Sequence, residues 1–119
     1  WLSTCAPERT GDIAAYYLGI SDDGAEVHFD GTPTFDPTDD ACDWACDYIY
    51  RGEDEWTSSQ ALFAFASISE QAEEEVPVLL YLLCLGYVGL LVQACAPGIL
   101  DKPAAVGFDD GDAFVVFRG

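Results

Sequence analysis

Residues 76–96 read VPVLLYLLCLGYVGLLVQACA and contain one strongly polar side chain, Gln93. Three glutamates at 73–75 precede the stretch and Pro97-Gly98 follows it, which is typical of a helix with an acidic N-terminal end and a sharp stop. The stretch is long enough to cross a bilayer, but its upstream flank is acidic and only Lys102 is close downstream. We therefore predict a helix buried in the centre of a domain and no membrane association.

Apolar stretches interrupted by turn signals flank this helix. Residues 13–20 and 25–30 are separated by Ser-Asp-Asp-Gly, and two apolar runs near the C-terminus are separated by Asp-Asp-Gly-Asp at 109–112. Both patterns predict β-hairpins. The aromatic alternation from Trp44 to Gly52 predicts another strand, and Thr57 and Ser58 are candidate caps of a shorter helix through residue 71.

The order of strands, helices and strands predicts a single α+β domain over residues 1–119. We expect one antiparallel sheet built from the N- and C-terminal hairpins. The long buried apolar helix, together with the shorter helix, would pack on this sheet.

The charge is strongly one-sided, with 22 acidic residues against four basic ones and a formal net charge of -18. Direct binding to nucleic acid is disfavoured, because phosphates are bound by Lys and Arg. Three explanations of the acidity stay open: a basic partner, a cytoplasm rich in salt, and solubility alone. Of the three, only a basic partner implies a specific function, since charge complementarity steers association and sets specificity.

The five cysteines form an odd set, and Cys84 and Cys95 lie inside the apolar stretch. This pattern favours free thiols in a reducing cytoplasm. The spacing of Cys42 and Cys46 resembles half of a metal site, but no second pair follows, so we predict neither a metal nor another cofactor.

Catalytic machinery is scarce. His28 is the only histidine, and it occupies the strand parity opposite Val27 and Phe29, which favours a surface or half-buried position. We therefore predict that the protein is not an enzyme.

Acidic residues gather in predicted turns around an aromatic-rich segment, a composition that resembles a protein interface. The predicted partner-binding residues are Asp22, Asp23, Asp36, Asp39, Asp40, Asp43, Trp44, Asp47, Tyr48, Tyr50, Glu53, Asp54, Glu55, Trp56, Asp109, Asp110 and Asp112. The alternative interpretation is that the aromatic side chains belong to the core and that the acidic ones are only solvated.

The size, the acidity, the segment CDWACDYIY at 42–50 and the closing hairpin VGFDDGDAFVVF at 106–117 resemble small bacterial immunity proteins of polymorphic or contact-dependent toxin systems. The resemblance implies a cytoplasmic, non-catalytic inhibitor that binds and neutralises a cognate toxin with a basic surface, such as a nuclease. The alternatives are a nucleic-acid-mimic inhibitor and a small ligand-binding or enzymatic α+β domain with a pocket between sheet and helix. A deep cavity that contains His28 or a perturbed carboxylate would favour the ligand-binding or enzymatic alternative. The sequence leaves the oligomeric state open.

Overall fold

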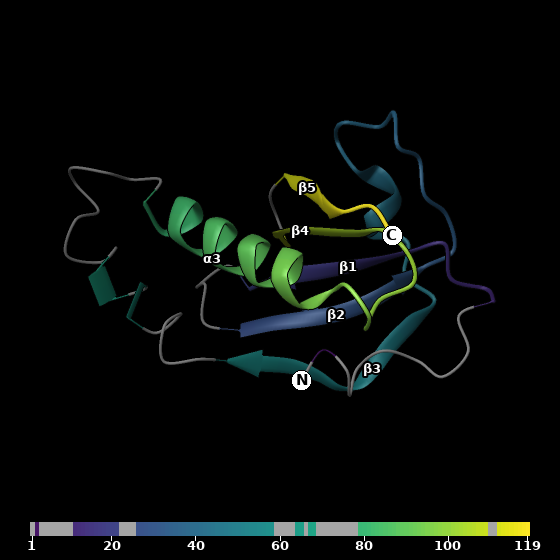
Figure 1. Cartoon of the computed structure of the whole chain (residues 1–119). Coiled ribbons are helices and arrows are strands. Elements are labelled where there is room, and N and C mark those ends of the chain that lie inside the picture. Colours follow the sequence, from purple (N-terminus) through teal and green to yellow (C-terminus); the bar gives the residue numbers. More distant parts are fainter. Residues whose placement is uncertain are drawn as a thin grey trace.

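The computed structural model describes residues 2, 11–21, 26–58, 64–65, 67–68, 79–109 and 112–119, without the side chains of 50–58, 80 and 81. Its centre is a five-stranded sheet with the order β3-β2-β1-β4-β5 (Figure 1). The strands are β1 (Ala15–Ile20), β2 (Glu26–Thr32), β3 (Tyr50–Ser58), β4 (Ala104–Phe108) and β5 (Ala113–Phe117). The α+β class is therefore confirmed.

Both predicted hairpins are present, since β1 pairs antiparallel with β2 and β4 pairs antiparallel with β5. The prediction of an entirely antiparallel sheet is wrong, because β1 and β4 are parallel at the centre of the sheet. A parallel pair needs a long crossover, usually a helix that returns the chain to the starting end. The helix before β4 provides that return, so the second hairpin joins the first in a mixed sheet.

Helix α3 (Leu79–Cys95) lies within the predicted apolar stretch and covers one face of the sheet (Figure 1). Cys84, Val88 and Val92 are buried against the sheet at a spacing of four residues, as one face of a helix requires. Leu82 and Leu90 on other faces are 62% and 68% exposed. The prediction of a helix buried all round is thus not confirmed. Among the described residues, no helix combines the length and the apolar character that a membrane span requires.

The predicted shorter helix is not confirmed. Its candidate caps, Thr57 and Ser58, belong to β3. Residues 64–65 and 67–68 are helical, and the rest of the segment 59–71 lies outside the described residues.

The segment from Trp44 to Gly52 is not the predicted strand. Residues Asp43–Cys46 form a short 3-10 helix, η1, and β3 begins only at Tyr50. The Asp39 carboxylate accepts hydrogen bonds from the backbone N–H groups of residues 41 and 43, at 3.0 and 2.7 Å. Such side-chain bonds to the local backbone compete with strand pairing, and they fold this segment into turns.

The two faces of the sheet carry different cores. Tyr16, Leu18 and Phe29 point towards α3, and the rings of Tyr16 and Phe29 stack with centroids 5.0 Å apart. Tyr17 and Trp44 belong to the second cluster, on the opposite face, where η1 packs. Strand alternation thus splits the apolar residues between two layers, and the second face holds the candidate site.

Candidate binding cavity

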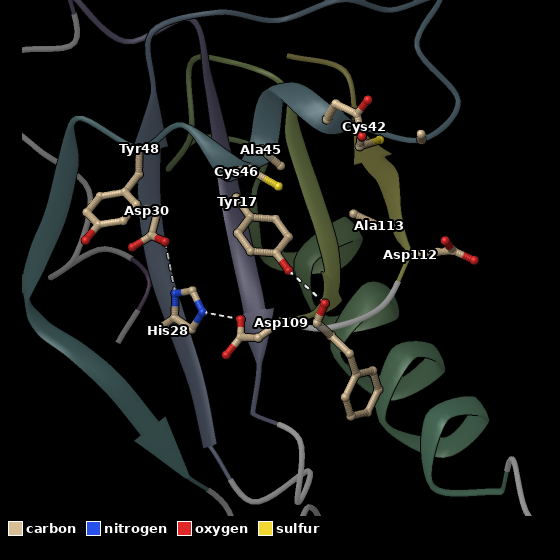
Figure 2. A pocket seen from close by; sticks show the side chains of 13 residues that line it. Tyr17, His28, Asp30, Cys42, Ala45, Cys46, Tyr48, Asp109, Asp112 and Ala113 are labelled. Carbon is tan, nitrogen blue, oxygen red and sulfur yellow. Dashed lines mark hydrogen bonds and ion pairs between the residues drawn. The ribbon is translucent and has the colours of Figure 1, made fainter.

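A cavity of about 470 Å³ lies on the face of the sheet that carries η1. Its walls come from β1, β2, η1 with its flanking loop, and the turn between β4 and β5 (Figure 2). The lining residues are Tyr17, His28, Asp30, Ala41, Cys42, Asp43, Ala45, Cys46, Tyr48, Phe108, Asp109, Asp112 and Ala113. Pockets of this size accept a small molecule or a single long side chain.

His28 lies between two carboxylates at one side of this cavity (Figure 2). Its Nδ1 is 3.1 Å from Oδ2 of Asp30, and its Nε2 is 2.6 Å from Oδ1 of Asp109. His28 and Asp30 are buried, whereas the Asp109 side chain is 36% exposed. Both ring nitrogens therefore face acceptors, an arrangement that suits the doubly protonated imidazolium.

Burial opposes the charged form of His28, but hydrogen bonds and charge attraction from Asp30 and Asp109 outweigh it. The pKa of His28 is consequently raised above its ordinary value. The two carboxylates thus favour the protonated ring, and His28 links β2 to Asp109, the residue that follows β4.

This link crosses the central strand at Gly19. In the strand register Gly19 stands opposite both His28 and Gly107. A Cβ atom at Gly19 would overlap with Nε2 of His28 and Oδ1 of Asp109. The absence of a side chain is therefore what allows His28 and Asp109 to meet above β1.

Tyr17 lies at the centre of the cavity (Figure 2). Its hydroxyl donates to the backbone oxygen of Phe108 at 3.3 Å, and its ring packs edge-on against His28 with centroids 5.8 Å apart. Burial, followed by the negative charge of Asp109, raises the pKa of Tyr17. The phenol therefore stays neutral at physiological pH and closes the cavity floor.

The chemistry of the lining favours binding of a cation. The lining includes four carboxylates, and His28 is the one described lining side chain with a basic group. Asp43 and Asp112 are exposed, and within the described part of the chain neither side chain has a hydrogen-bond or ion-pair partner. Among the described residues, no group of three or more His, Cys, Asp or Glu side chains has a geometry that could hold a metal ion.

The structure brings together some of the predicted partner-binding residues and not others. Those that line the cavity are Asp43, Tyr48, Asp109 and Asp112. Asp36, Asp39, Asp40 and Asp47 lie on the loops around η1, exposed or half-buried, and do not line it. The predicted acidic loop at Glu53, Asp54 and Glu55 is part of a strand, since these residues lie in β3 together with Tyr50 and Trp56. The side chains of all five are not described. Asp22, Asp23 and Asp110 lie outside the described residues.

Trp44 needs a correction, because it is 6% exposed and packs edge-on against Phe35 with ring centroids 5.1 Å apart. It belongs to the second core cluster and is not an exposed anchor. His28 is likewise buried, not at the surface or half-buried as predicted.

Sequence reasoning also missed Tyr17 and Asp30. The spacing His28-x-Asp30 on one strand was the available signal, since alternate residues share a face.

No family model, curated protein or solved structure matches the chain. The geometry of the cavity and the charge of the chain are therefore the basis for a functional proposal.

Proposed function

We propose that the protein is a non-catalytic binding domain that captures a basic side chain of a protein partner in the cavity beside η1. The observation that carries this proposal is the lining itself, in which carboxylates come from several separate elements and no described Lys or Arg side chain takes part. A partner with a basic surface would be steered to this face by the net charge of -18.

Asp43 and Asp112 carry the charge argument, because Asp109 already faces His28. Asp30 already faces His28 and stands opposite Arg51 in the register of β2 and β3. An arginine or lysine that enters the cavity would meet Asp43 on the η1 side and Asp112 on the side of the β4–β5 turn. The half-exposed ring of Tyr48 offers an apolar contact for its aliphatic part.

His28 supports binding more than catalysis. A general base must present a nitrogen to the substrate, whereas both nitrogens of His28 lie against carboxylates. The imidazolium instead fixes Asp109 at the cavity rim. In this proposal His28 is a positioning residue.

The experiment uses N-acetyl-arginine amide as the probe and its neutral citrulline counterpart as the control, titrated into isotopically labelled protein. We expect the arginine probe alone to shift the resonances of Tyr17, Tyr48 and Asp112. The variant Asp112→Asn should weaken this binding several-fold, whereas the matched loop variant Asp36→Asn should not. Equal effects of the two probes, or of the two variants, would contradict the proposal.

The biological role that fits this binding mode is an immunity-type inhibitor whose cognate toxin has a basic face, for example a nuclease. If a neighbouring gene encodes a toxin domain, coexpression with that domain should protect the host cell. Replacing Asp39, Asp40, Asp43 and Asp47 with Asn should slow association with that toxin and flatten its salt dependence. Unchanged association kinetics would contradict the inhibitor role, whereas capture of the arginine probe is tested separately by Asp112→Asn.

A second candidate is a pocket for a small organic cation, and the specific observation in its favour is a cavity that contains His28. The two candidates differ in affinity for a free probe. If the site captures one side chain of a protein partner, the free arginine probe should bind with a Kd of only about 1 mM. A dedicated small-molecule site should instead bind its ligand with a Kd of about 1 μM. A nucleic-acid mimic remains the third prediction from the sequence.

A further inference from the structure

Strand β5 forms one edge of the sheet, and β4 is the only described strand beside it. The strand reads AFVVF without a charge or a proline, and Phe114 is 53% exposed. Natural proteins usually protect edge strands with charges, prolines or a covering segment, because a free edge offers unpaired N–H and C=O groups to another strand. Within the described part of the chain, no backbone hydrogen bond reaches the outer edge of β5.

The residues that bracket β5 are oppositely charged. Asp112 precedes the strand and Arg118 follows it, so the segment reads DAFVVFR, with the two opposite charges each three residues from Val115. Both charged residues are exposed, and neither has an ion-pair partner among the described residues. An antiparallel copy of the same segment centred on Val115 would place each Asp112 opposite the Arg118 of the other copy.

We propose that β5 pairs antiparallel with β5 of a second copy, forming a two-fold dimer with one continuous sheet whose register is set by two Asp112–Arg118 ion pairs. A two-fold interface must be self-complementary, and this segment meets the requirement in both charge and apolar character. Opposite charges directly across an antiparallel pair stabilise it, and like charges destabilise it. The dimer shares Asp112 with the proposed cavity site, but Arg118 does not line the cavity, so Arg118→Asp tests the dimer alone.

The bulge in the β4–β5 ladder bears on the register. The pairing shifts between Ala104 and Ala105, so Val116 is an extra residue in β5 without a register partner in β4. A bulge limits the length of regular pairing. The register between the two β5 strands would therefore be selected by the two Asp112–Arg118 ion pairs more than by the number of paired residues.

The overall charge predicts an unusual salt dependence. Two copies that each carry a formal charge of -18 repel one another, and this repulsion is long-range. Salt screens it over a Debye length of about 10 Å at 0.1 M. Salt also weakens the two Asp112–Arg118 ion pairs, but these are few compared with the 18 net negative charges on each copy. Added salt should therefore strengthen the dimer.

Sedimentation velocity of the full chain over a concentration series, at about 0.1 M and about 1 M NaCl, tests the proposal. We expect a monomer–dimer equilibrium that shifts towards the dimer at high salt. Arg118→Asp and Asp112→Arg should each raise the dissociation constant at least about tenfold, and the double swap should restore it. Circular dichroism of each variant verifies that it folds.

Two controls separate this interface from other causes of association. Asp47→Arg changes the net charge as Asp112→Arg does, but at an exposed loop position, so it should leave the dimer intact or slightly strengthened. Leu90→Lys alters the exposed face of α3 and should have no effect. A monomer at all concentrations and both salt levels, a dimer insensitive to the charge variants, or a dimer lost only with Leu90→Lys would each overturn the proposal.

Discussion

Replacing Gly19 with alanine tests the link between His28 and Asp109 most directly. The new methyl group would occupy the space in which these two side chains meet above β1. His28 is buried and packs against Tyr17, whereas the Asp109 side chain is partly exposed. We therefore expect His28 and Asp109 to separate, with Asp109 turning towards solvent. The fold should survive, since the backbone of Gly19 does not adopt a positive φ angle.

The magnitude follows from two contributions. A hydrogen bond to a charged group contributes about 1.5–3 kcal/mol, and the partial exposure of Asp109 places this one at the low end. Overpacking of a filled site costs about 1–3 kcal/mol more. Together they predict a loss of about 3 kcal/mol in the free energy of unfolding, a large share of the total for a domain of this size.

Urea denaturation followed by circular dichroism measures this loss. Gly86→Ala is the matched control, because Gly86 lies in α3 and a Cβ there has no atom within 4 Å. That control should gain about 0.5–1 kcal/mol from the higher helix propensity of alanine. A Gly19→Ala variant within about 0.5 kcal/mol of the native protein would refute the reasoning.

Two further predictions concern titration and thiol chemistry. The pKa of folded His28 is raised, so its contribution to stability is complete below pH about 6.5 and is lost as the pH rises through the raised pKa. Urea midpoints between pH 6 and 8 at constant ionic strength should therefore fall with pH, and His28→Gln should remove the slope; a slope that persists in this variant would assign it to other groups. A thiol-reactive dye should label Cys46 and Cys95 at once, because both are exposed, and should label Cys42 and Cys84 only on unfolding. Burial raises the pKa of Cys84 to about 11, and burial together with nearby aspartates raises that of Cys42. The experiment uses a variant in which the N-terminal cysteine outside the described residues is serine, and four thiols reacting at one rate would contradict the burial pattern.

The hairpins were predictable from the sequence because their signals are local. Each combines an alternating apolar run with a turn sequence, and β1–β2 and β4–β5 pair as expected. The parallel pairing of β1 with β4 was not predictable in this way, since it joins residues far apart along the chain through α3. Periodicity shows that a strand exists but not the direction of its neighbour.

The errors near η1 have a different cause. The aromatic alternation from Trp44 resembles a strand, yet the turn-forming hydrogen bonds of Asp39 and the positive φ of Cys42 direct the chain into a 3-10 helix. The candidate site was found in part. Asp109 and Asp112 were recognised as part of an acidic turn. The pairing of Asp109 with His28 was not predictable, because it depends on the space left by Gly19, and a glycine in a strand does not indicate which side chains will fill that space.

The parallel contact between β1 and β4 also has a consequence for biosynthesis. Tyr16 donates a hydrogen bond to Asp101, a partner 85 positions later in the chain. During translation β1 and β2 emerge long before β4, and the edge of β1 that pairs with β4 stays open until β4 has left the ribosome. Such non-local closure slows folding. A chain interrupted before β4 would therefore leave the apolar edge of β1 unpaired in the middle of the sheet, where it could pair with another chain.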